Sequence, residues 1–170
     1  VWFNAYDSST LYAATRDYAR TAPNSVMALA ADSLSEDAAP FSGRVDAVTG
    51  TKLAGAGNLF VWFAQVSSGN EGFFPNSYSL AYKTQDNGDV QSVVTGNFTG
   101  GAGSDILAGT KSPTAGQGTI ELWKSNDAAS PTFTRLDTYP PGGSIPGNNL
   151  GEVTCMAISD INGAGYKNLI

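Results

Sequence analysis

The chain reads GNLFVWF at residues 57–63 and GTIELWK at residues 118–124, and a shorter version, VWF, stands at residues 1–3. Each phrase contains a tryptophan, and the three tryptophans follow one another at intervals of 60 and 61 residues. They are Trp2, Trp62 and Trp123. A sequence that returns at a period of this length predicts a repeat protein, in which each copy forms one structural unit.

Two further phrases recur in the same order around the tryptophan phrase. VMALAA at residues 26–31 corresponds to VQSVVT at residues 90–95 and to VTCMAI at residues 153–158. VDAVTGTK at residues 45–52 returns as SDILAGTK at residues 104–111, and KNLI at residues 167–170 begins a third copy. Because the order of the phrases is kept, the repeat extends over nearly the whole chain.

Each phrase has the composition of a β-strand. The phrases are short and rich in β-branched and aromatic residues, and Gly, Asn, Asp, Ser or Pro separates them. Residues 119–124 alternate polar and apolar, which is typical of a half-buried antiparallel strand. Residues 26–31 and 153–158 are more evenly apolar or small, as a strand covered on both faces would be. A fourth strand is predicted after each tryptophan, at residues 10–15, 78–83 and 132–136.

Four antiparallel strands in a unit of about sixty residues is the format of a propeller blade. Radial stacking buries the sheet faces between neighbours and leaves only short edges exposed. We therefore expect an all-β fold, a β-propeller segment of about 2.5–3 four-stranded antiparallel blades that belongs to a larger propeller. The expected divisions are the end of a preceding blade, two blades and the start of the next, at residues 1–25, 26–89, 90–152 and 153–170.

A polar, glycine-rich loop ending in Asp or Asn lies between the first and second strands of a unit. It reads NFTGGAGSD at residues 97–105 and DINGAGYKN at residues 160–168. With the strand and glycine-rich turn that follow, this loop resembles the FG-GAP or VCBS repeat of integrin-α-like β-propellers. The resemblance implies a Ca²⁺ site, because alternating oxygen ligands on a tight turn suit a hard cation. The ligands that it implies are Asp160, Asn162 and Asn168 in one loop and Asn97, Thr99 and Asp105 in the other.

Both loops depart from the family pattern at the fifth position, which is Gly101 in one and Ala164 in the other. Each loop therefore has one oxygen ligand fewer and carries only one or two charges, which lowers the expected affinity for Ca²⁺. The alternative is a metal-free turn in which Asp105 and Asn168 accept hydrogen bonds from backbone amides.

Charge and composition exclude several classes of function. The net charge is −6 and no basic patch appears, so a nucleic acid is not expected as a partner. No apolar run is long enough to span a bilayer. The chain has no histidine and a single cysteine, which argues against hydrolytic triads and zinc sites, and we expect no enzymatic activity. Cys155 lies in a first-strand phrase and is expected to be a buried thiol.

Two groups of aromatic residues are candidates for contacts. Trp2, Trp62 and Trp123 occupy one fixed strand position, which favours packing between blades over binding of a sugar. Phe73 and Phe74 lie in an insertion at residues 67–77 that the other units lack, and Tyr78 follows it. An apolar loop tip suggests contact with a neighbouring chain or domain; the alternative is that both Phe rings fold back onto their own blade.

Together these features predict a non-enzymatic module, secreted or at the cell surface, for protein–protein interaction, adhesion or structural assembly. Its expected partner is another protein or further copies of the same protein. The alternative is a carbohydrate-binding, lectin-like propeller, or the accessory propeller of a carbohydrate-active enzyme, with a glycan as its partner.

Overall fold

A computed structural model describes most of the chain. The described residues are 2–3, 18–19, 22, 24–34, 45–54, 57–67, 70–73, 77–85, 88–113, 117–139, 151–160 and 168–169. Every regular element among them is a β-strand, which confirms the all-β prediction for this part of the chain. The same residues contain no helix that is long and apolar enough to cross a membrane.

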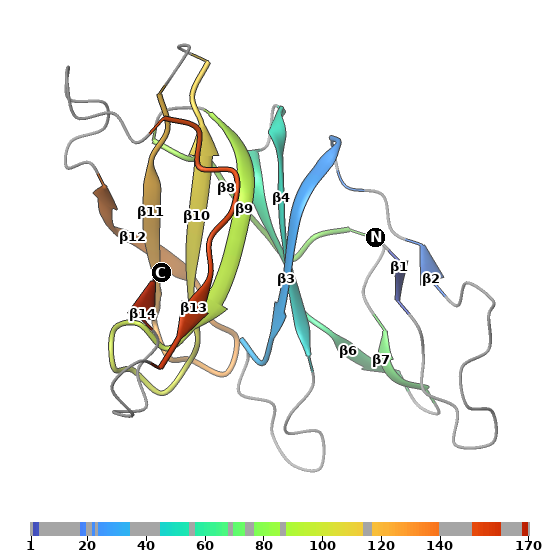
Figure 1. Cartoon of the computed structure of the whole chain (residues 1–170). Helices are drawn as coiled ribbons and strands as arrows, with labels where there is room; N and C mark the ends of the chain where they lie inside the picture. The colour runs from blue at the N-terminus through green and yellow to red at the C-terminus, as the bar shows by residue number, and fades with distance from the viewer. Residues whose placement is uncertain are drawn as a thin grey trace.

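Two four-stranded antiparallel sheets form the body of the molecule (Figure 1). The first sheet has the order β3-β4-β5-β8, with bounds Val26–Asp32, Asp46–Ala54, Gly57–Trp62 and Leu80–Tyr82. The second sheet has the order β9-β10-β11-β12, with bounds Asp89–Gly96, Asp105–Lys111, Ile120–Ser125 and Phe133–Tyr139. Each sheet is thus a meander of one predicted unit, and β9 of the second sheet packs against β3 and β4 of the first.

Three two-stranded pairs complete the described structure. They are β1 with β2 (Trp2–Phe3 and Tyr18–Ala19), β6 with β7 (Gln65–Ser67 and Asn70–Phe73), and β13 with β14 (Ile158–Ser159 and Asn168–Leu169). The β6–β7 hairpin is inserted between the third and fourth strands of the first sheet. The second sheet has only a short turn at that place, closed by the Asn126 amide donating to the Thr132 carbonyl at 3.1 Å.

The two sheets share one strand register. Ala47 pairs with Trp62 in the first sheet, and Ile106 pairs with Trp123 in the second. The pairing of the first two strands also shifts at the same place in both sheets, between Val26 and Ala28 and between Val90 and Ser92. The sequence repeat is therefore a repeat of hydrogen-bonded structure, down to an irregularity in the ladder.

The main apolar core lies between the two sheets. Alternate residues of each strand point into it, because successive side chains of a strand face opposite sides of the sheet. Its buried members are Leu34, Val48, Leu59, Val61, Val90, Val93, Ile106, Ala108, Trp123 and Phe133. A second cluster, on the other face of the first sheet, consists of Ala47, Phe60, Trp62 and Ala64.

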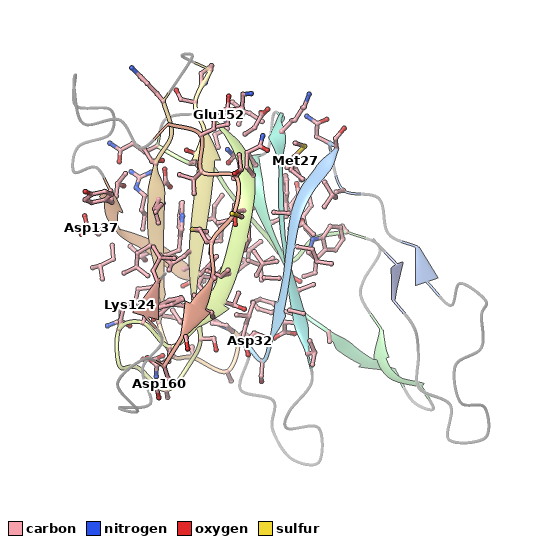
Figure 2. All side chains as sticks on the ribbon, in the orientation of Figure 1. Met27, Asp32, Lys124, Asp137, Glu152 and Asp160 are labelled. Atoms are coloured by element: carbon pink, nitrogen blue, oxygen red, sulfur yellow. The ribbon has the colours of Figure 1, made fainter. Side chains whose placement is uncertain are left out.

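The prediction that the first-strand phrases are covered on both faces is wrong for two of them. In β3, Ala28 and Ala30 pack against the main core, but Leu29 is 50% exposed and Met27 is exposed beside it (Figure 2). Only one of the two complete sheets lies against β3, so its other face stays open. Of the 153–158 phrase, only Ile158 is assigned to a strand.

Cys155 is exposed, contrary to the expectation of a buried thiol. Residues 151–160 run along the second sheet, with Glu152 at one end and Asp160 at the other (Figure 2). The Val153 amide donates to the Thr110 carbonyl at 3.1 Å, which fixes this segment on one side. Among the described residues no complete sheet covers its other side, and the thiol is left facing outward.

Candidate functional site

The contact between the two sheets is the most elaborate feature of the described structure. Tyr82 of β8 packs on Trp123 of β11, with ring centroids 5.0 Å apart, and meets Phe133 of β12 edge-on at 6.3 Å. The Phe133 amide donates to the Tyr82 hydroxyl at 2.8 Å. One tyrosine therefore joins the sheets by aromatic packing and by a hydrogen bond to the backbone of an outer strand.

Burial raises the pKa of Tyr82 above its ordinary value, because desolvation disfavours the charged phenolate. The hydrogen bond from the Phe133 amide acts in the opposite direction and lowers the pKa, but its effect is the smaller of the two. The hydroxyl is consequently held neutral while it accepts the backbone hydrogen bond.

A buried carboxylate lies beside this aromatic contact. Glu121 of β11 is fully buried, and its Oε1 accepts a hydrogen bond from the Gln85 amide at 2.6 Å. Its Oε2 lies 3.9 Å from Nη1 of Arg135, whose guanidinium also sits over the Trp123 ring at 5.8 Å. Burying a carboxylate is costly unless it is paired. Here the Arg135 guanidinium and the amide of Gln85, a residue that follows β8 of the first sheet, both lie against it.

Each sheet contains one buried aspartate that holds the start of its second strand, and we call these Asp46 and Asp105 the clasp aspartates. Asp46 accepts from the Ala64 amide at 2.8 Å and from the Leu34 amide at 3.1 Å. Asp105 accepts from the Ser125 amide at 3.0 Å, and its second oxygen accepts from two loop amides. Ala64 and Ser125 both stand two residues after the tryptophan of their unit, so the two clasps are equivalent.

The loop at residues 97–105 contains the three ligands that the family resemblance implies, and the side chains of Asn97 and Asp105 accept hydrogen bonds from its backbone. Asn97 is engaged within the loop: its amide group donates to the Gly101 carbonyl at 2.5 Å and its oxygen accepts from the Gly100 amide at 2.7 Å. Asp105 accepts from the amides of Phe98 and Thr99 at 3.0 and 2.9 Å. The arrangement matches that of an Asx-stabilised turn.

Asp127, which the sequence did not suggest, completes this loop. It lies in the β11–β12 turn with φ of 55°, and its Oδ1 accepts from the Gly103 amide at 2.8 Å. A side chain at Gly101 would overlap the Asp127 carboxylate. Thus a carboxylate from another hairpin occupies the place of the fifth loop side chain.

The loop combines carboxylates with one buried polar atom, the Thr99 Oγ1, for which the structure shows no hydrogen-bond partner. No group of three or more His, Cys, Asp or Glu side chains suited to a metal ion occurs in the described part of the chain. The Ca²⁺ assignment stays a prediction.

The other implied loop is only partly described. Asp160 is half-buried directly after β13, and Asn168 pairs with Ser159 in the β13–β14 ladder. Asn162 lies outside the described residues.

Of the predicted contact residues, Phe73 and Tyr78 fall on different elements of the described structure. Phe73 ends β7 of the inserted hairpin, and Phe74 lies outside the described residues. Tyr78 packs on the first sheet, with its ring centroid 4.8 Å from that of Phe60 and 6.2 Å from that of Trp62. Tyr78 therefore belongs to the second apolar cluster.

The tryptophans of the two complete sheets are both buried at the same register position. The Trp62 indole donates to the Thr49 hydroxyl at 3.0 Å, whereas the Trp123 nitrogen is buried with no hydrogen-bond partner. Ala108 stands at the position of Thr49 in the second sheet, so the hydroxyl is missing there. Trp2 lies in β1.

A comparison of the chain with protein-family models, with curated proteins and with solved structures finds no match.

Proposed function

We propose that this chain is a segment of a β-propeller of the FG-GAP or VCBS type, working without catalysis as an extracellular or cell-surface module for protein–protein contact. One observation carries the proposal. Val90, at the start of β9, fills the space above Gly50 of the first sheet, and Val153 fills the space above Gly109 of the second. Gly50 and Gly109 occupy equivalent positions, so the same contact packs each sheet against the unit that follows it.

The reason for glycine at both positions is the closeness of this approach. A Cβ atom at Gly50 would overlap the Val90 side chain, and one at Gly109 would overlap that of Val153. A contact that recurs from unit to unit stacks the sheets face to face, as in repeat proteins whose units touch only their neighbours. This recurrence supports a propeller-like stack.

The element best suited to a partner is the β6–β7 hairpin. Stacked sheets form a rigid frame, and binding residues on such frames are found mostly on irregular connections. The hairpin is an insertion that the second sheet lacks, and it projects away from both sheets in Figure 1. A protein partner would therefore be recognised by this projection, while the sheets hold it in place.

Two features favour a protein partner over catalysis or a sugar. The chain has no histidine, and its clasp aspartates are occupied by backbone amides. Trp62 and Trp123 are 2% and 5% exposed, so their faces are not open for stacking on a sugar ring.

The test is to probe arrays of extracellular proteins and of glycans with the purified chain. A variant in which residues 65–73 are replaced by a short Gly-Ser linker is compared with the matched surface variant Val45→Ser, since Val45 is exposed outside the hairpin. We expect protein binding that the linker variant loses and Val45→Ser keeps. Glycan binding without protein binding would overturn the proposal in favour of the lectin-like alternative.

A further inference from the structure

The two terminal strand pairs correspond to the two halves of one four-stranded sheet. In β1–β2, Trp2 pairs with Ala19, so the tryptophan strand pairs with the strand that follows it, as the third and fourth strands do in both complete sheets. In β13–β14, Ile158 pairs with Leu169. This is the register of the first and second strands, in which Ala31 pairs with Ala47.

The free edge of β14 is the edge that a tryptophan strand occupies elsewhere in the molecule. Leu169 stands at the position of Ala47 and Ile106. Those two residues pair on their other side with Trp62 and Trp123. Leu169 is 39% exposed, and β14 pairs only with β13 among the described strands.

The outer face of the second sheet carries a tyrosine at the position where the first sheet contacts its neighbour. Tyr139 pairs with Ile120 as Tyr82 pairs with Leu59, so the two tyrosines are equivalent. Tyr82 is covered by Trp123 of the next sheet, whereas Tyr139 is 59% exposed. Residues 151–159 already lie on this face, held by Val153 and by an ion pair of 2.7 Å between Lys111 and Glu152. Among the described strands, no tryptophan strand covers this face.

The two halves lie apart within one chain. In Figure 1, β1–β2 lies beyond the first sheet, on the side away from the second, whereas β13–β14 lies over the second sheet. Both complete sheets stand between them. Within one chain the β1–β2 hairpin therefore does not reach β13–β14, whereas the β1–β2 hairpin of a second copy can.

We propose that the β1–β2 hairpin of a second copy of this chain completes the sheet begun by β13–β14. In this composite sheet Leu169 pairs with Trp2 of the second copy, and that indole covers Tyr139 as Trp123 covers Tyr82. The inference rests on the proposed stacked-sheet module. Two copies joined in this way at both ends contain two complete sheets each and two composite sheets, and six sheets lie within the range of about four to eight at which propellers close.

The experiment measures molar mass by size-exclusion chromatography with light scattering. The wild-type chain is expected at twice its monomer mass of 17.6 kDa. Trp2→Arg disrupts the β1–β2 side of the junction, and Leu169→Arg disrupts the β13–β14 side. Each variant alone is therefore expected to be monomeric. Val45→Arg, which adds the same charge at an exposed valine in neither hairpin, should keep the dimer.

Mixing the two monomeric variants gives the sharpest readout. Leu169→Arg keeps an intact β1–β2 hairpin and Trp2→Arg keeps an intact β13–β14 pair, so an equimolar mixture should form a one-to-one dimer through one remaining junction. Tyr139→Arg tests the same junction without altering either hairpin, and should also yield a monomer with an unchanged circular dichroism spectrum.

Three results would overturn the proposal. These are a wild-type monomer at every concentration, a dimer that survives all three junction variants, and a mixture that stays monomeric although the wild type dimerises. None of them bears on the array experiment, because protein binding by the β6–β7 hairpin does not depend on the oligomeric state. If the chain dimerises but binds no protein on the arrays, the proposed junction is retained and the proposed function is wrong.

Discussion

At the scale of single residues, the clasp aspartates stabilise the fold by accepting several backbone hydrogen bonds in a buried position. The two Asp105 oxygens accept three backbone N–H groups, from Phe98, Thr99 and Ser125. In Asp105→Asn an amide NH₂ replaces one acceptor and faces a backbone donor in a buried site. We expect the free energy of unfolding to fall by about 1–3 kcal/mol, the cost of leaving a buried polar group unsatisfied.

The measurement is urea denaturation followed by tryptophan fluorescence. Asp137→Asn is the matched control, because Asp137 is an exposed aspartate on β12 and its loss should change stability by less than about 0.5 kcal/mol. Equal effects of the two substitutions would show that the Asp105 clasp contributes nothing particular.

Tyr82 predicts a dependence of stability on alkaline pH. Its pKa in the folded chain lies above the ordinary value of 10.0, and desolvation is the main cause. The folded state therefore keeps this proton more tightly than the unfolded state does, so the stabilisation is complete below about pH 10 and is lost as the pH rises toward the folded-state pKa. Tyr82→Phe should be less stable than wild type at neutral pH, by about 0.5–1.5 kcal/mol for the lost hydrogen bond.

Melting temperatures measured between pH 7 and 11 test this prediction. The difference between wild type and Tyr82→Phe should narrow above about pH 10, where the phenol of the unfolded chain ionises. A constant difference across this range would contradict the assignment of Tyr82 to a desolvated contact.

At the scale of elements, Gly50 decides how closely β9 approaches the first sheet. Gly50→Ala would place a methyl group against Val90, and overpacking of this kind costs about 1–3 kcal/mol. Val90→Ala removes part of the obstruction, so the double variant should lose less stability than the sum of the two single losses. Additive losses in chemical denaturation would mean that the two residues do not touch.

The strands could be predicted from the sequence, because the repeated apolar phrases define them in each sheet. The phrases at residues 57–63 and 118–124 correspond to β5 and β11, and the fourth strands predicted at 78–83 and 132–136 correspond to β8 and β12. The fourth strand predicted at residues 10–15 lies outside the described residues. Asp105 was found as a loop residue through the repeat. The strands of the β6–β7 hairpin could not be predicted, because this segment occurs once and no second copy of it identifies a repeated phrase.

The contacts between sheets could not be predicted in the same way. Tyr82 packs on Trp123, and Glu121 accepts a hydrogen bond from Gln85. The partners in each pair are 36 or more positions apart in the sequence, and patterns within a single sequence do not specify such pairs. Asp127 was missed because it reaches the 97–105 loop from another hairpin. The exposure of Leu29 and Cys155 depends on what lies beyond each strand, which composition alone does not show.

At the scale of the whole molecule, one arrangement recurs along the chain: the first strand of a unit packs over a glycine of the preceding sheet. The Gly50–Val90 and Gly109–Val153 contacts are two instances of it. Tyr82 adds an aromatic contact with Trp123 of the second sheet. Tyr139 of the second sheet occupies the equivalent position. The proposed partner binding and the proposed composite sheet both use this frame.

The most direct test is a ¹⁵N-edited nuclear Overhauser measurement on the labelled chain. The stacked arrangement of the two sheets predicts a cross-peak between the Phe133 amide proton and the ring protons of Tyr82, 51 residues away. It predicts another between the Gly50 α-protons and the Val90 methyl groups in the matching ¹³C-edited spectrum. If both residue pairs are assigned and neither cross-peak is present, the two sheets do not stack face to face and the proposed repeat of stacked sheets is wrong.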